Sequence, residues 1–338
     1  MHYKEILNAF KDDLPEERQW WPDYFYHFTD VHNAVSIIDI GWIYSRAKVL
    51  ADNIMISDNA SRIVIENTEA DNKLFGRLYF RPLTPTQYHN EGFKPESVRH
   101  QDINASCPVP VFFLLSVERT MELDDVKFAE RGVSGGRQNI REGVDEFRKL
   151  NLNKIYHHGF YDRQTDSDIR EFRQSEVIRE GGFPLSNLIR GVFCRSNAER
   201  ETLLYLLKKQ SSKQYEFYKK RIMYRPKLKM FFSNGIFIRE LNIVDDELLV
   251  ELNDTHFRLK QEVVEVPLKV EISINYLGEK GQPLGVSEVS REVNYCTVKQ
   301  VDMKLKKIAG CISVLVKVMF DNTKMYENEL LVIDDVIW

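Results

Sequence analysis

The last third of the chain carries the pattern that most constrains its fold, a series of short segments in which apolar and polar residues alternate. Turn-forming stretches such as LNDTH (252–256), LGEKGQPLG (277–285) and FDNTK (320–324) separate these segments. Alternation with a period of two places apolar side chains on one face of a strand, and closely spaced short strands are typical of two packed antiparallel sheets. The pattern predicts a β-sandwich over residues 231–338, with strands at GIFIREL, ELLVEL, HFRLK (256–260), VPLKVEISINYL, VNYCTVK, CISVLVKVMF and ELLVIDDVIW.

The first 205 residues mix helical and extended patterns, so the whole chain is predicted to be an α+β protein. VPVFFLLSVE (109–118) is a continuous apolar run of strand length, as expected for a buried strand. Further strands are expected at 21–29, 76–80, 176–180 and 188–194, the last two joined by a turn, and helices at 4–13, 30–41, 139–152 and 197–210.

Local signals refine these boundaries. Gly41 is expected to end the helix that follows the first strand, and Asn197 is a plausible cap for the helix at 197–210. Two prolines and a glycine predict that RPLTPTQYHNEG (81–92) is a loop. We expect three parts: a first domain over 1–205, a basic and aromatic connecting helix over 206–230, and an accessory domain over 231–338.

The net charge of −4 is unevenly distributed along the chain. Residues 231–338 carry 12 Lys and Arg against 18 Asp and Glu, so the first 230 residues have a net charge of +2. Between 208 and 229 there are nine basic residues, one acidic residue and four interleaved aromatic residues. Positive charge with aromatic stacking suits a single-stranded nucleic acid. An amphipathic connecting helix with a solvated basic face would have the same composition.

The sequence carries no signal for export, membrane insertion or metal binding. The N-terminal stretch has no apolar signal core, and no apolar run approaches the roughly 20 residues that span a bilayer, so we expect a cytoplasmic protein. The four cysteines are far apart and lack CxxC spacing, and the histidines lack the spacing of metal ligands. We therefore predict neither a bound metal nor a disulfide scaffold.

Four stretches combine residue types that could carry chemistry. In YHFTDVHN (26–33), a His and a Thr two residues apart point to one face of a strand. YSR (44–46) supplies an arginine, and YFRPLTPTQYHNEG (79–92) places a proline-stiffened loop at a strand end, a common position for a binding site. REFRQSE (170–176) places a glutamate at the start of a later strand. Each also has an ordinary interpretation, such as a buried histidine bonded to its neighbour or a solvated glutamate.

Taken in order, these stretches resemble the DarT family of nucleic-acid ADP-ribosyltransferases. The matching pieces are YHFT with Asn six residues after the His, then IxxxGWIYSR, YFxPxTPxxY and RQSEVI–GG–PL–I. The resemblance covers about residues 24–200. It implies an ADP-ribosyltransferase-like split β core that uses NAD to attach ADP-ribose to a nucleic-acid base. It also implies a toxin of a toxin–antitoxin or anti-phage system.

Carried over residue by residue, the resemblance implies an NAD site. His27 matches the histidine that orients NAD, and Thr29 and Asn33 match residues near the nicotinamide and its ribose. Arg46 matches an arginine near the cofactor, and Tyr88 matches an aromatic residue at the end of the loop.

The resemblance also implies that Glu176 is the catalytic glutamate, because it follows an RQ-small pair as in the family. One position departs from the pattern. The loop arginine of the thymidine-modifying members falls on Leu83, while Arg81 stands where those members usually have Asn. This chain therefore modifies a different base, or Arg81 takes over the catalytic role from a shifted position.

The expected chemistry suits these residue types. A carboxylate under the ribose stabilises the positive charge that develops when the nicotinamide–ribose bond breaks, and it also helps to deprotonate the attacking base. Arg46 or Arg81 can pair with the pyrophosphate. The segment 119–175, which contains ERGVSGGRQN (130–139), is expected to close over the acceptor. Predicted contacts with single-stranded DNA or RNA are Arg170, Arg173, Lys219, Lys220 and Arg221.

Two other functions remain open on the sequence alone. The same fold could transfer ADP-ribose to a protein or deplete NAD by hydrolysis, and a degenerate first domain could serve only as a binding scaffold. The acidic domain over 231–338 is expected to bind something other than nucleic acid, such as an antitoxin, a chaperone or a phage protein.

Overall fold

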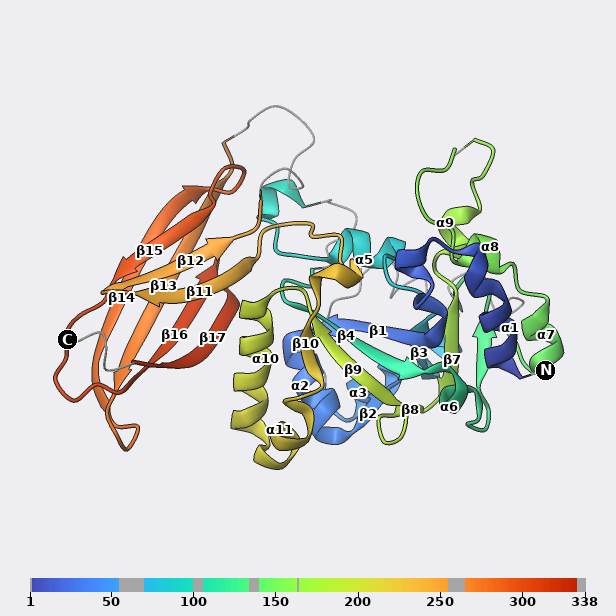
Figure 1. Cartoon of the computed structure of the whole chain (residues 1–338), viewed down its shortest axis with the longest axis horizontal. Coiled ribbons are helices and arrows are strands. Elements are labelled where there is room, and N and C mark those ends of the chain that lie inside the picture. Colours follow the sequence, from blue (N-terminus) through green and yellow to red (C-terminus); the bar gives the residue numbers. More distant parts are fainter. Residues whose placement is uncertain are drawn as a thin grey trace.

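The computed structural model describes residues 2–54, 70–99, 106–133, 140–162, 164–254 and 265–332. The described part of the first 230 residues forms a mixed body around one large sheet, and the described residues after about 236 form a second body whose regular elements are strands (Figure 1). The helix α10 (Asn197–Gln210) lies between the two bodies (Figure 1). None of the helices in the described ranges is both long and apolar enough to cross a membrane.

The large sheet has eight strands in the order β10-β9-β4-β1-β3-β7-β5-β6. Its neighbours pair antiparallel, apart from the parallel pair β9–β10. Every residue of β4 is buried, which confirms the strand predicted at 109–118. The strands are β1 (Tyr24–Asp30), β3 (Phe75–Tyr79), β4 (Pro110–Ser116), β5 (Lys127–Ala129), β6 (Ile140–Arg141), β7 (Glu176–Glu180), β9 (Ile189–Cys194) and β10 (Ile222–Tyr224).

Short helices surround this sheet, and a two-stranded sheet pairs β2 (Trp42–Tyr44) with β8 (Gly182–Pro184). The helix after β1 begins where the Asp30 side chain accepts a hydrogen bond from the His32 amide, and it ends at Gly41 with φ of 78°. The helices are α1 (Tyr3–Phe10), α2 (Val31–Ile40), α3 (Arg46–Ala51), α5 (Pro85–Asn90), α6 (Val117–Met121), α7 (Val144–Arg148), α8 (Leu152–Ile155), α9 (Ile169–Phe172), α10 and α11 (Ser212–Tyr218).

Several sequence predictions need correction. The expected loop at 81–92 contains α5, because Thr84 caps it and Pro85 occupies a first-turn position, where its missing N–H costs nothing. Ser196, not Asn197, caps α10 by accepting a hydrogen bond from the Glu199 amide. The predicted helix at 139–152 is only partly confirmed, because residues 140–141 form β6, Val144–Arg148 form α7, and α8 begins only at Leu152.

The segment 206–230 does not form one connecting helix. It contains the end of α10, then α11, and then β10, which joins the edge of the large sheet beside β9. The segment is therefore built into the first body. Both strands predicted at 176–180 and 188–194 are present as β7 and β9, but the connection between them contains the strand β8, and β9 pairs with β4.

The C-terminal body is the predicted β-sandwich, with a three-stranded sheet and a four-stranded sheet. Buried and exposed residues alternate along β13, as the sequence pattern predicts. The expected strand at 293–299 is wrong, because β14 ends at Asn294 and β15 starts at Gln300. The segment 256–260 and the last six residues lie outside the described ranges. The strands are β11 (Ile238–Val244), β12 (Glu247–Leu252), β13 (Pro267–Leu277), β14 (Pro283–Asn294), β15 (Gln300–Lys304), β16 (Ser313–Phe320) and β17 (Thr323–Leu331).

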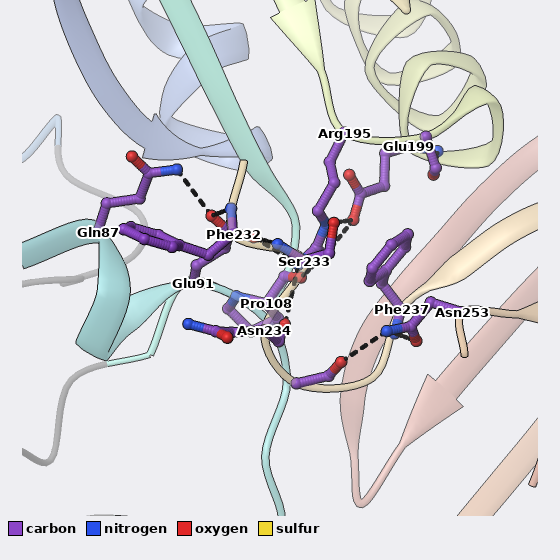
Figure 2. A network of polar contacts seen from close by, with 12 residues as sticks. Gln87, Glu91, Pro108, Arg195, Glu199, Phe232, Ser233, Asn234, Phe237 and Asn253 are labelled. Atoms are coloured by element: carbon purple, nitrogen blue, oxygen red, sulfur yellow. Dashed lines mark hydrogen bonds and ion pairs between the residues drawn. The ribbon is translucent and has the colours of Figure 1, made fainter. Parts of the chain in front are cut away.

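A buried polar network joins the two bodies (Figure 2). Arg195, at the end of β9, contacts Glu91 at 3.7 Å and forms a hydrogen-bonded ion pair with Glu199 of α10. The Glu91 carboxylate accepts hydrogen bonds from the amides of Phe232 and Ser233, which lie in the segment leading to the sandwich. All three charged side chains are at most 1% exposed, so this junction is closed to water.

Candidate active site

The first residue of β7, Glu176, is buried between its neighbouring strands β3 and β5. Its side chain is 7% exposed, and its Oε2 atom accepts a hydrogen bond of 2.8 Å from the Val133 amide. Its Oε1 atom lies 3.8 Å from the Arg77 guanidinium and accepts no hydrogen bond from any described residue. Among the described residues, one carboxylate oxygen is thus held by a hydrogen bond, and the other faces only the Arg77 guanidinium.

Two residues of the neighbouring strand β3, Arg77 and Tyr79, lie beside Glu176. Tyr79 lies opposite Glu176 in the antiparallel register, and Arg77 lies two residues before it, on the same face of β3. Burial, and then the charge of Glu176, raise the pKa of Tyr79 to about 12, so its hydroxyl stays protonated at neutral pH. Thr86 of α5 donates a hydrogen bond of 2.9 Å to Gln174 and so ties α5 to the approach to Glu176.

His27 lies across β3 from Glu176, where the sheet opens. The strands β1 and β3 share a single paired position, Tyr26 opposite Tyr79, and the His27 ring reaches the Arg77 carbonyl at 3.2 Å. Burial lowers the pKa of His27 to about 4, so the ring is neutral at pH 7. Arg77 therefore connects the two predicted residues, through its carbonyl to His27 and its guanidinium to Glu176.

The other predicted NAD-site residues come from three different elements. Thr29 is buried two residues after His27 on β1. Asn33 lies in the first turn of α2, and Arg46 is the first residue of α3. Tyr88 on α5 is 46% exposed, and its ring packs edge to face on Phe232 at 5.2 Å, beside the segment that leads to the sandwich.

Arg81 is buried, and each hydrogen bond of its side chain goes to a main-chain carbonyl. Nε donates to Pro82, and Nη1 donates to Ile155 and His157. Burial and the neighbouring Arg173 lower its pKa well below the usual value. This geometry favours a scaffolding role for Arg81 in place of the predicted catalytic one, because the guanidinium holds α8 and the residues after it.

The predicted nucleic-acid contacts fall into two groups. Arg170 and Arg173 belong to the α9 turn that leads directly into β7, so they lie near Glu176 in the chain. Lys219, Lys220 and Arg221 follow α11 and precede β10. Because β10 is five strand positions from β7, the second group lies about 24 Å from the strand of Glu176 across the sheet.

Sequence reasoning missed Arg77, Tyr79 and the Val133 amide. A weak signal was available for the first two, because alternate residues of GRLYF share one face of a strand that ends at the proline-rich loop. Their contact with Glu176 depends on strand register between segments about 100 residues apart, which local patterns do not specify.

The chemistry of these side chains fits NAD. A buried carboxylate with one oxygen free of hydrogen bonds suits a ribose hydroxyl and a cationic sugar, and neutral His27 and Tyr79 add no competing positive charge. The described residues contain no cluster of three or more His, Cys, Asp or Glu that could hold a metal ion.

Comparisons with known proteins agree with this assignment. A sequence model described as "DarT: ssDNA thymidine ADP-ribosyltransferase, DarT" matches residues 26–232, more than half of the chain. A search of curated proteins finds no match to the chain.

Solved structures of DarT proteins also resemble it. Thermus sp. 2.9 DarT in complex with NAD+ is 16% identical with a TM-score of 0.44, covering 64% of this chain and 99% of that one. The same protein in complex with ADP-ribosylated ssDNA is 16% identical with a TM-score of 0.45, covering 62% and 97%. Thermosipho africanus DarTG in complex with ADP-ribose is 16% identical with a TM-score of 0.45, covering 65% and 53%.

Proposed function

The chain belongs to the DarT family and is an NAD-dependent ADP-ribosyltransferase; from this premise we propose that it modifies a base of single-stranded DNA. The observation that carries the proposal is the buried carboxylate of Glu176, which is held by one main-chain amide and has a second oxygen that accepts no hydrogen bond from a described residue and faces Arg77. The acceptor class is supported by the family description, which names single-stranded DNA.

The reaction breaks the bond between nicotinamide and ribose and forms a bond from that ribose to the base, which gives up a proton. Glu176 stabilises the positive charge that develops on the sugar, because its carboxylate is buried and fixed before the reaction begins. The same carboxylate accepts the proton from the base. His27 and Tyr79 stay neutral at pH 7, so they contact the substrate without opposing this charge.

The identity of the base depends on the loop after β3. Leu83, which stands in place of the arginine of thymidine-modifying members, has a positive φ of 60° and donates its amide to the Gln87 side chain at 2.7 Å. Arg81 is occupied with main-chain carbonyls and is poorly placed to replace that arginine. We therefore propose that this chain selects its base differently from the thymidine-modifying members.

Mass spectrometry of separate DNA and RNA oligonucleotides, incubated with the protein and NAD, tests the proposal. We expect a gain of one ADP-ribose on single-stranded DNA, lost in Glu176→Gln, and fragmentation identifies the base. Modification of RNA alone would contradict the DNA acceptor. Release of nicotinamide without any labelled oligonucleotide would move the function to a protein acceptor or to NAD hydrolysis.

We also propose that the protein acts as a toxin and that residues 231–338 bind a regulatory partner, such as an antitoxin, a chaperone or a phage protein. The acidic charge of this domain supports a partner other than nucleic acid. Growth arrest on induction, absent in Glu176→Gln, tests the first part. Cross-links from a co-purified partner that map only to residues 26–232 would contradict the second.

A further inference from the structure

Three arginines from separate segments converge beside the loop that follows α8. Arg18 and Arg81 both lie against the indole of Trp21, at 5.1 and 4.8 Å from its ring centre. Arg173 donates hydrogen bonds to the His157 ring at 2.7 Å and to the Gly159 carbonyl at 2.8 Å. The three charges also act on each other, because Arg173 and Arg18 both lower the pKa of Arg81.

This cluster forms no ion pair with a carboxylate of the described residues, although the charge of the adjacent Glu17 partly offsets the burial that lowers the pKa of Arg18. No carboxylate of the described ranges lies within 4.0 Å of any of the three guanidinium groups, whereas Arg195 faces two carboxylates. Two of the guanidinium nitrogens, Nη1 of Arg18 and Nε of Arg173, are buried and meet no acceptor there. The Nε1 atom of Trp21, whose side chain is 1% exposed, also lacks an acceptor. Buried cationic donors of this kind call for an anion.

The surrounding loop has the features of a single-strand contact. Phe160 is 96% exposed, the most exposed large apolar side chain of the described residues. Tyr161 lies under Arg173, with the guanidinium 4.9 Å from its ring centre. The His157 ring is neutral at pH 7, because burial and the nearby Arg173 lower its pKa. An anion site flanked by an exposed aromatic residue matches a strand whose phosphates are neutralised while its bases stack.

We propose that Arg18 and Arg173 bind a backbone phosphodiester of the acceptor strand, with Phe160 stacking on a neighbouring base. Arg81 and Trp21 form the scaffold of this site. The inference rests on the proposed function, and it adds a part of the chain that the family does not supply. Arg18 and Trp21 lie before residue 26, outside the match to the family. Arg173 is three residues before Glu176 in the chain.

The test measures binding of single-stranded DNA by fluorescence anisotropy, without NAD, in the full-length Glu176→Gln protein. Adding Arg18→Gln or Arg173→Gln should weaken binding about tenfold, as for the loss of a charge-assisted hydrogen bond. Each should also lower the slope of log affinity against log salt by about 0.7. Arg148→Gln is the matched control, because Arg148 is exposed on α7 and pairs with Asp145.

Oligonucleotides with one uncharged methylphosphonate linkage, moved along the strand, locate the phosphate. At one position of the strand, the uncharged linkage should lower the DNA affinity of the parent protein about tenfold. The same linkage should not change the DNA affinity of the Arg18→Gln protein. Unchanged DNA affinity in both arginine variants would overturn the proposal. So would a raised KM for NAD, measured for each arginine variant with Glu176 intact, without any change in DNA affinity, because this result would assign the anion to the NAD pyrophosphate.

The failure of this proposal is distinguishable from that of the proposed function. If the wild-type protein labels DNA and the arginine variants bind it normally, only the phosphate site is wrong. If the wild-type protein neither binds nor labels DNA, the acceptor class itself is wrong.

Discussion

Two buried glutamates of the first body differ in how completely the protein satisfies them. Glu91 accepts hydrogen bonds from Gln87, Phe232 and Ser233, and it faces Arg195 at 3.7 Å. Among the described residues, Glu176 accepts one hydrogen bond, from Val133, and its other oxygen faces the Arg77 guanidinium at 3.8 Å.

The difference separates a structural carboxylate from a reactive one. Burying a charge is costly unless it is paired and hydrogen-bonded, and at Glu91 the protein itself supplies these partners. At Glu176 part of that stabilisation is missing, so a substrate that supplies it binds favourably. The Glu91 carboxylate therefore helps to hold the two bodies together. The Glu176 carboxylate can still accept hydrogen bonds from a substrate.

The largest effect is expected at the β7 site. Glu176→Gln keeps the shape of the side chain and removes its charge, so ADP-ribose transfer should fall about 100- to 10,000-fold. The melting temperature should stay nearly unchanged, because Gln can still accept the Val133 hydrogen bond. The rate is measured by label transfer from NAD, with Glu180→Gln, at the exposed end of β7, as the control. A strongly destabilised Glu176→Gln protein would contradict the contrast with Glu91.

At the junction around Arg195, a substitution should lower the stability of the fold strongly and the rate of ADP-ribose transfer little. Arg195→Met removes the cation between two buried carboxylates and should cost about 3–5 kcal/mol of unfolding free energy. Transfer per folded molecule should persist. Chemical denaturation measures the loss, and Arg190→Met is the control, because Arg190 on β9 is exposed and donates to carbonyls of Asn187 and Ile189. If transfer is lost while the protein remains folded, the junction and the reaction site are coupled.

The junction should also make stability depend on pH. Two carboxylates share one guanidinium, and burial raises the pKa of Glu199 from 4.5 to about 7. The Oε2 atom of Glu199 is buried and meets no partner among the described residues, so no donor there stabilises the ionised form. The folded state then binds more protons than the unfolded state between these two values. This contribution to stability is complete below pH 4.5 and is lost as the pH rises through 7.

Melting temperatures at about pH 5 and pH 8 measure this effect against Glu199→Gln, which imitates the protonated acid. From pH 5 to pH 8, the unfolding free energy of the wild-type protein should fall by at most about 3 kcal/mol relative to that of the variant, since one pKa unit corresponds to about 1.4 kcal/mol. A wild-type protein that gains stability relative to Glu199→Gln as the pH rises would show that Glu199 is ionised in the fold.

Local sequence patterns predicted the elements whose signals are local. Alternation predicted the sandwich, and the buried run at 109–118 predicted β4. The helix α5 was missed because Pro85 reads as a loop residue unless Thr84 is recognised as its cap. Ser196 and Asn197 are both good caps, and a choice between neighbours needs the main-chain geometry.

In the candidate active site, too, the residues marked by local sequence patterns were predicted, and those placed by strand register were missed. Glu176 and His27 were predicted from the order of short stretches, and the structure places both in contact with Arg77. Arg77 itself was missed, because its role comes from the register between β3 and β7. Arg81 was predicted to act on substrate, but carbonyls more than 70 residues away in the chain turn its guanidinium into the protein.

The smallest effect is expected at the far edge of the large sheet, a third region that sharpens the comparison. Lys220→Gln removes an exposed charge beside β10, about 24 Å from the strand of Glu176. A short oligonucleotide that fills only the β7 site should bind Lys220→Gln with unchanged affinity. An oligonucleotide several times longer can reach both regions. For this oligonucleotide, the slope of log affinity against log salt concentration should be smaller in magnitude by about 0.7 in Lys220→Gln than in the wild-type protein. Anisotropy titrations at several salt concentrations measure both, with exposed Lys280→Gln in the sandwich as the control. Equal losses for the short and long oligonucleotides would place the basic segment on the path of the reacting strand, and the reactive region would then extend across the sheet.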